Sequence, residues 1–141
     1  MPDYPQAGDT HVVERSFSTE EVRRFAALSN DDQPRHTEPD EHGRLLVHGL
    51  LTATLPTEVG GDLGVLGRSF TFEFHRPVYT GQTVRCECGV ERVEETDARY
   101  DLSVDVTCTR ESGAEADGGG NGDAGQEVVM TGTVTGLVRK S

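Results

Sequence analysis

The sequence predicts an α+β domain in which an antiparallel sheet wraps one face around an apolar helix. Three observations lead to this fold class. The most apolar segment, residues 45–55, lies in the first half of the chain, and four segments of alternating apolar and polar residues follow it. At 141 residues, the chain has the length of a single domain with one core. We therefore expect residues 1–141 to form one domain.

The N-terminal part is predicted to hold a short strand followed by a helix. Residues 12–17 are the strand candidate. Ser18 and Glu21 have the spacing of a capping box, in which both side chains bond to backbone N–H groups at a helix start. The apolar residues that follow share one helical face, which indicates a helix over residues 19–29. It must end before Pro34, because proline disfavours helix in the residue before it.

A structured loop over residues 31–39 is expected to lead to a second helix. This helix begins near Gly49, within the apolar segment 45–55. Pro56 predicts a kink or an early end, because a proline inside a helix removes a hydrogen bond and clashes one turn back. The adjacent glycines at 60–61 are predicted to finish the helix.

Strands are predicted for the rest of the chain. Apolar and polar residues alternate around Phe70, Phe72 and Phe74, and again over residues 83–93, 100–109 and 127–138, with a turn at 77–82. Residues 111–127 hold five acidic residues and six glycines but no basic or aromatic residue. This composition predicts a flexible, solvated insertion.

The three cysteines are interpreted as small core residues. Cys86, Cys88 and Cys108 each alternate with valine or leucine, so they point to the apolar side of their strands. This placement favours a packing role over metal ligation or a disulfide.

Composition narrows the possible partners. The net charge is −12, and twelve of the thirteen basic residues are arginine, a combination that indicates a halophilic protein working at high salt. No basic face is available to bind nucleic acid. No signal peptide or membrane-spanning run is recognisable, so a cytoplasmic protein without membrane attachment is expected. Because only 33% of residues are hydrophobic and tryptophan is absent, a homodimer or higher homo-oligomer is expected to supply further burial.

Two short runs carry the functional argument. Residues 29–36 read SNDDQPRH, and residues 48–51 read HGLL at the start of the apolar helix. A carboxylate, an imidazole and a helix start thus lie within about twenty residues. An acid–base pair beside a helix N-terminus is suited to chemistry on a carbonyl-activated substrate.

These runs resemble the motif of the MaoC-like dehydratases, also called (R)-specific enoyl-CoA hydratases. The family pattern is phenylalanine-alanine, a small residue and Gly-Asp-x-Asn-Pro-x-His, followed later by His-Gly-Met or His-Gly-Leu. Asp31 is the aspartate five residues before His36, so it matches the pattern and Asp32 does not. The resemblance continues through RPV at 76–78 and GQTV at 81–84 and covers most of residues 12–138.

The resemblance implies a hot-dog fold, in which the apolar helix lies inside a curved antiparallel sheet. It also implies dimers that take an acyl-thioester substrate, either acyl-CoA or an acyl-carrier-protein thioester, near the subunit interface. Three residues depart from the family pattern: Asn30 replaces its glycine, Gln33 replaces its asparagine, and Pro56 interrupts the helix. We expect these changes to affect substrate range more than reaction type.

The implied reaction is the reversible addition of water to a trans-2-enoyl thioester. In this reading Asp31 is the principal base and His36 shares the proton transfer, with one water between them. The backbone N–H of Gly49 is expected to stabilise the developing oxyanion. Gln33 is expected to contact the loop or the substrate, and His48 to position the helix.

No metal and no cofactor is expected, because no set of histidines, cysteines and carboxylates shows ligand spacing. A polyanionic coenzyme A would be repelled by the acidic chain, and the arginines considered to offset this are Arg35, Arg68 and Arg76. His75 fits no constellation. Two alternatives stay open: an acyl-CoA thioesterase of the same fold, and a non-catalytic acyl-thioester-binding subunit.

Overall fold

The computed structural model describes residues 4–111 and 125–140. Most of the predicted flexible insertion, residues 112–124, lies outside the described residues. The elements in chain order are β1 (Thr10–Ser16), α1 (Thr19–Ser29), α2 (Pro34–Thr37), α3 (Gly49–Thr52), α4 (Thr54–Leu63), β2 (Leu66–Phe74), β3 (Thr83–Glu95), β4 (Arg99–Glu111) and β5 (Gln126–Arg139).

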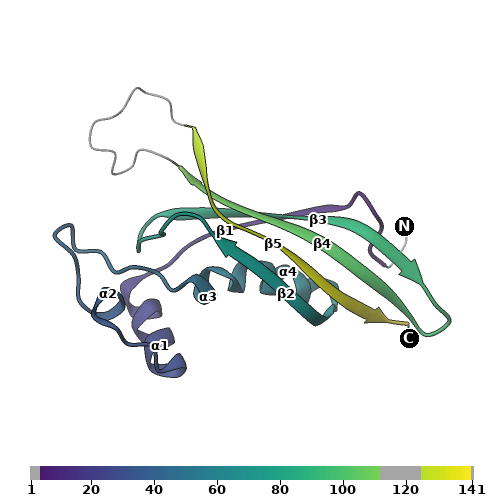
Figure 1. Ribbon diagram of the computed structural model, residues 1–141, viewed down its shortest axis with the longest axis horizontal. Coiled ribbons are helices and arrows are strands. Elements are labelled where there is room, and N and C mark those ends of the chain that lie inside the picture. The colour runs from purple at the N-terminus through teal and green to yellow at the C-terminus, as the bar shows by residue number, and fades with distance from the viewer. Residues whose placement is uncertain (1–3, 112–124, 141) are drawn as a thin grey trace.

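A single five-stranded sheet has the order β1-β3-β4-β5-β2, and every pairing in it is antiparallel. The helical segments α3 and α4 run along one face of this sheet, and α1 and α2 lie at one end of the molecule (Figure 1). This is the α+β arrangement that the sequence predicts, with the sheet curved around the apolar helix. Among the described residues, no helix combines the length and the apolarity needed to cross a bilayer.

The first helix begins and ends where the sequence predicts. The Ser18 hydroxyl accepts a hydrogen bond from the Glu21 N–H (3.1 Å), and the Glu21 carboxylate accepts one from the Ser18 N–H (3.0 Å). Asn30 ends the helix in the left-handed conformation, with φ of 63°. Asparagine tolerates this region better than other side chains, so it can replace the glycine of the family pattern.

Two predictions about the helices are wrong. Residues 34–37 form a helical turn within the expected loop, because Pro34 takes the first position of a helix, where no N–H is needed. The central helix also continues past the glycines at 60–61 to Leu63 and ends at Gly64 with φ of 74°. Buried side chains, including Val59, pack this helix against the sheet and outweigh a helix cost of about 1 kcal/mol per glycine.

The kink expected near Pro56 is confirmed. The helix is divided at Ala53 into α3 and α4. Pro56 is the third residue of α4, so it lies in a first turn whose N–H groups have no partner inside that segment. The proline is therefore accommodated close to the break, and its neighbour Leu55 is fully buried.

The core lies between the central helix and the sheet. Its largest fully buried side chains are Phe17, Leu45, Leu55 and Met130. Cys86, Cys88 and Cys108 are free thiols with at most 2% exposure, as their predicted core role requires. The turn predicted over residues 77–82 is present, and an isolated bridge pairs Leu46 with Tyr79 next to it. This bridge brings the segment before α3 against the turn between β2 and β3.

Candidate functional site

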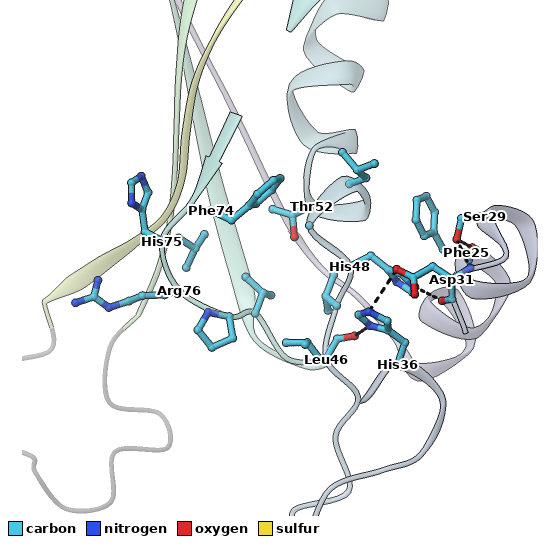
Figure 2. A pocket seen from close by; sticks show the side chains of 16 residues that line it. Phe25, Ser29, Asp31, His36, Leu46, His48, Thr52, Phe74, His75 and Arg76 are labelled. Carbon is cyan, nitrogen blue, oxygen red and sulfur yellow. Dashed lines mark hydrogen bonds and ion pairs between the residues drawn. The ribbon is translucent and has the colours of Figure 1, made fainter. Parts of the chain in front are cut away.

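A cleft of about 660 Å³ lies where the loop after α1, the start of α3 and the end of β2 meet. Its lining includes Asp31, His36, His48, Gly49 and Phe74. Figure 2 shows Asp31, His36 and His48 grouped on one side and Phe74 on the opposite side, followed by His75 and Arg76. Four of the five predicted site residues therefore line one cavity.

Asp31 is held in place by the turn that follows α1. Its N–H donates to the Ser29 hydroxyl (3.2 Å), and that hydroxyl donates to the Phe25 carbonyl (2.7 Å). Its carboxylate Oδ1 accepts a hydrogen bond from the side-chain amide of Gln33 (2.9 Å). This bond is the largest cause that lowers the pKa of Asp31 below its ordinary value, despite some desolvation. Gln33, the fifth predicted residue, thus acts on the cleft through Asp31.

His36 is buried, and its ring is oriented by a backbone carbonyl. Nδ1 lies 2.7 Å from the Leu46 oxygen, which can only accept, so Nδ1 carries the proton in the neutral ring. The unprotonated Nε2 then faces Asp31, 3.8 Å from Oδ2. The pair therefore presents two proton acceptors to the same point in the cleft.

His48 connects the Asp31 loop to the central helix. Its Nε2 donates to the backbone carbonyl of Asp31 (2.9 Å). Its ring stacks on that of His36 with centroids 3.7 Å apart and meets the edge of Phe25. Its Nδ1 is buried, and no partner for it exists within residues 4–111 and 125–140. Because His48 is the residue before α3, these contacts couple the helix start to the Asp31 loop.

Gly49 opens α3 and lies against the ring of Phe74. A Cβ at residue 49 would come within 2.8 Å of the Phe74 ring, so a larger residue would force the two segments apart. As the first residue of the helix, Gly49 has an N–H without an intrahelical partner. Gly49 is also among the residues that line the cleft.

The structure also brings together a possible chelate that sequence spacing did not reveal. One ligand atom from each of Asp31, His36 and His48 lies within 4.8 Å of the other two. However, the two imidazoles are nearly parallel, at 15°. Lone pairs in two nearly parallel planes do not converge on an ion about 2.1 Å from each nitrogen. As arranged, the group is better suited to proton transfer than to metal binding.

The arginines considered for charge compensation are not equivalent. Arg76 lines the cleft. Arg68 is paired with Asp101 at 3.6 Å, and neither Arg68 nor Arg35 is among the cleft-lining residues. Sequence reasoning missed Leu46, whose contribution is a carbonyl that no side-chain pattern reveals. It also missed Phe74 and His75, which the alternation indicated only as part of a strand.

A sequence model of the thioesterase superfamily matches residues 46–107. The match includes Gly49 and Phe74 but neither Asp31 nor His36. It therefore covers the central helix, β2, β3 and most of β4 and leaves out Asp31 and His36.

Two characterised proteins match over most of the chain. The (R)-specific enoyl-CoA hydratase of Aeromonas caviae is 33% identical over 119 residues, covering 74% of this chain and 81% of that protein. The mitochondrial 3-hydroxyacyl-[acyl-carrier-protein] dehydratase of Arabidopsis thaliana is 26% identical over 110 residues, covering 73% of this chain and 66% of that protein. The chain thus spans just under two thirds of the plant protein.

Solved structures share the same fold. The R-hydratase PhaJ1 of Pseudomonas aeruginosa has a TM-score of 0.77 at 17% identity, covering 97% of this chain and 84% of its own. The (R)-hydratase of A. caviae has a TM-score of 0.69 at 25% identity, covering 95% and 96%. A MaoC-like dehydratase of Rhodospirillum rubrum has a TM-score of 0.70 at 18% identity, covering 97% and 94%. The chain therefore belongs to the MaoC-like dehydratase and (R)-specific enoyl-CoA hydratase family and has a hot-dog fold.

Proposed function

We propose that this protein is an (R)-specific enoyl-CoA hydratase, which in reverse is a (3R)-hydroxyacyl-CoA dehydratase. The observation that carries the proposal is the 3.8 Å separation between Asp31 Oδ2 and His36 Nε2, the ring nitrogen that does not face the Leu46 carbonyl. The substrate is a trans-2-enoyl thioester of coenzyme A or of an acyl carrier protein. The two characterised relatives carry names of this reaction class.

The pair can hold a water in the orientation that attack requires. Hydrogen bonds from water are about 2.8 Å long, so one oxygen can be that far from both Oδ2 and Nε2. Since both protein atoms are acceptors, the water donates both of its protons. Its lone pairs then point away from the pair, toward the β-carbon of a bound enoyl group.

Proton transfer completes the addition without a net change in the protein. As the water oxygen bonds to the β-carbon, one proton passes to Asp31, and the other stays on the new hydroxyl, hydrogen-bonded to His36. The electron pair of the double bond moves through the α-carbon onto the thioester oxygen. Return of a proton from the pair to the α-carbon gives the 3-hydroxyacyl thioester. General acid–base assistance of this kind accounts for about 10²–10⁴ in rate.

The Gly49 N–H supplies the donor for the negative charge that develops on the thioester oxygen. Losing one such donor typically reduces turnover by about 10²–10³. The close contact between Gly49 and Phe74 holds this donor against the wall of the cleft. His48 positions the site by fixing the helix start to the Asp31 carbonyl.

The test is incubation of the purified protein with crotonyl-CoA in concentrated potassium chloride. Loss of the enoyl absorbance without release of free thiol is the expected result. Release of free thiol would instead identify the thioesterase alternative, which the thioesterase-superfamily match favours. If neither signal appears while crotonyl-CoA binds, the protein is a non-catalytic acyl-thioester-binding subunit and the hydratase proposal is wrong.

The protein is further proposed to be a homodimer or higher homo-oligomer. Strand β2 is at the sheet edge, and its Leu66, Phe70 and Phe74 are between 51% and 58% exposed. An edge strand with exposed apolar side chains is a ready pairing surface. Among the structural neighbours, the Mycobacterium tuberculosis ChsH1–ChsH2 and HadBC proteins are described as complexes. Light scattering is expected to give at least twice the monomer mass, and Phe70→Glu to lower it.

A further inference from the structure

We infer that Arg76, beside His75 on the wall opposite Asp31, binds a phosphate of the arm that carries the acyl thioester. The inference rests on the proposed function. It assigns a ligand group to the end of the cleft that lies away from Asp31 and His36. Figure 2 shows Arg76 and His75 at the far side of the cavity from Asp31 and His36, with Phe74 between the two groups.

The charge around Arg76 is unusual for this chain. The Glu127 carboxylate Oε1 lies 3.8 Å from Arg76 Nε and 3.1 Å from Arg110 Nη1. Two guanidinium groups thus lie beside one carboxylate at this wall, in a protein of net charge −12. His75, whose Nε2 is 2.8 Å from the Thr131 hydroxyl, adds a polar neighbour. Among the described lining residues, Arg76 is the only guanidinium and Asp31 the only carboxylate.

The order of atoms in the substrate indicates that the carrier arm, attached through the thioester sulfur, extends toward Arg76. The β-carbon must lie at the water held by Asp31 and His36, and the thioester oxygen at the Gly49 N–H. The sulfur follows the carbonyl carbon, so the carrier arm leaves the site on the side away from the acid–base pair. Gly49 lies against Phe74, and the chain continues from Phe74 directly to His75 and Arg76. The arm therefore leads toward the wall that holds Arg76.

A phosphate is the group on that arm that a guanidinium recognises. Coenzyme A and the prosthetic group of acyl carrier proteins both carry a phosphate beyond the pantetheine portion. Arginine binds phosphate through paired, charge-assisted hydrogen bonds, which lysine does not reproduce. Such a contact also reduces the repulsion between a polyanionic substrate and an acidic protein.

The test compares thioesters that do and do not carry phosphate. Crotonyl-CoA and the crotonyl thioester of N-acetylcysteamine are assayed with the wild type, Arg76→Gln and Arg68→Gln, at the lowest salt that keeps the protein folded. Arg68 is a matched control on β2, because it is 54% exposed and 3.6 Å from an aspartate, whereas Arg76 is 48% exposed and 3.8 Å from a glutamate. Low salt is needed because screening weakens an exposed contact.

In Arg76→Gln, the ratio of kcat/KM for crotonyl-CoA to that for the truncated thioester is expected to fall about 5- to 10-fold. The change should appear as a higher KM for crotonyl-CoA at constant kcat. In Arg68→Gln the ratio should equal that of the wild type. An equal loss for both thioesters, or no loss for either, would overturn the inference.

A third thioester, crotonyl-4′-phosphopantetheine, shows which phosphate Arg76 binds. If it responds to Arg76→Gln as crotonyl-CoA does, the bound phosphate is the one shared by coenzyme A and carrier proteins. If it responds as the truncated thioester does, Arg76 binds a phosphate present only in coenzyme A. Both outcomes support a phosphate site.

Direct binding keeps this inference distinct from the proposed function. Calorimetry with free coenzyme A should show about 5- to 10-fold weaker binding to Arg76→Gln than to the wild type or to Arg68→Gln. A wild type that binds coenzyme A in this way but hydrates no thioester would contradict the hydratase proposal alone. Equal binding by all three proteins would contradict the phosphate site, whatever the activity.

Discussion

The imidazole of His36 faces the carboxylate of Asp31 at 3.8 Å, with Nε2 directed toward the acid and Nδ1 toward the Leu46 carbonyl. The Leu46 carbonyl sets this orientation by accepting the proton-bearing Nδ1 at 2.7 Å. The gap is too wide for a direct hydrogen bond and has the width for one water bonded to both groups. In a close ion pair the two groups would bond to each other. At this spacing both are available to a reactant.

Replacing either group is expected to abolish hydration. Asp31→Asn removes the base, and His36→Ala removes the second acceptor, so each should lower kcat on crotonyl-CoA by at least about 100-fold. Circular dichroism should show that both variants fold. Asp32→Asn changes the exposed neighbouring carboxylate and serves as the control, with activity close to that of the wild type. Near-normal turnover in either of the first two variants would contradict the assigned roles.

Gln33 is expected to set the acid limb of the pH–rate profile. Its hydrogen bond lowers the pKa of Asp31, and the ionised carboxylate is the active form, so activity is lost as pH falls through that lowered pKa. Gln33→Leu removes the donor, which raises the pKa and moves the limb of log(kcat/KM) to higher pH. Gln33→Glu should move it further, because a second carboxylate opposes ionisation. An unchanged limb in both variants would show that Asp31 is not the group that titrates.

The contact between Gly49 and Phe74 is expected to limit what residue 49 can be. Gly49→Ala places a methyl group against the Phe74 ring and should cost about 1–3 kcal/mol of stability along with much of the turnover. Phe74→Ala makes room for that methyl group. The double variant should therefore recover stability relative to the sum of the single changes, as a urea-denaturation cycle measures. Strict additivity would mean that the two residues do not interact.

We expect Asn30 to matter for its left-handed backbone conformation rather than for the chemistry of its side chain. Asn30→Ala should lower the free energy of unfolding by about 1–2 kcal/mol, because alanine pays the full cost of a left-handed backbone. Asn30→Gly should leave stability close to that of the wild type, since glycine adopts a positive φ without that cost. Urea titration of the two variants gives both values. Equal losses in both would indicate that the Asn30 side chain itself matters.

Stability is expected to increase with potassium chloride. A net charge of −12 on one small domain destabilises the folded state through self-repulsion, and salt screens it. At about 1 M salt the Debye length is roughly 3 Å, so most surface charges no longer interact. The melting temperature should rise between dilute buffer and molar potassium chloride, and a series in sodium chloride controls for a specific cation effect. A constant or falling melting temperature would contradict the proposed adaptation to high salt.

Local sequence was sufficient wherever the deciding contacts span only a few residues. The ends of α1 follow from the Ser18–Glu21 capping box and from the left-handed Asn30, and the strand alternation placed the cysteines in the core. The proximity of Asp31 and His36, expected from the family resemblance, also depends on a short segment, because the two residues are five apart in the chain. The end of the central helix was misjudged, because packing against the sheet, which is not local, outweighs the weak helix propensity of two glycines.

The sequence by itself determined the α+β fold class and the first helix, and its resemblance to the family singled out Asp31 and His36 as the candidate acid–base pair. Only the tertiary structure decided that the Leu46 carbonyl orients His36, that Phe74 lies against Gly49, and that Arg76, rather than Arg35 or Arg68, lines the cleft. The physical reason is the range of the interactions. A cap or a turn is specified by neighbouring residues, whereas the cleft forms only when the end of β2 and the start of α3, separated along the chain, are brought together by the sheet.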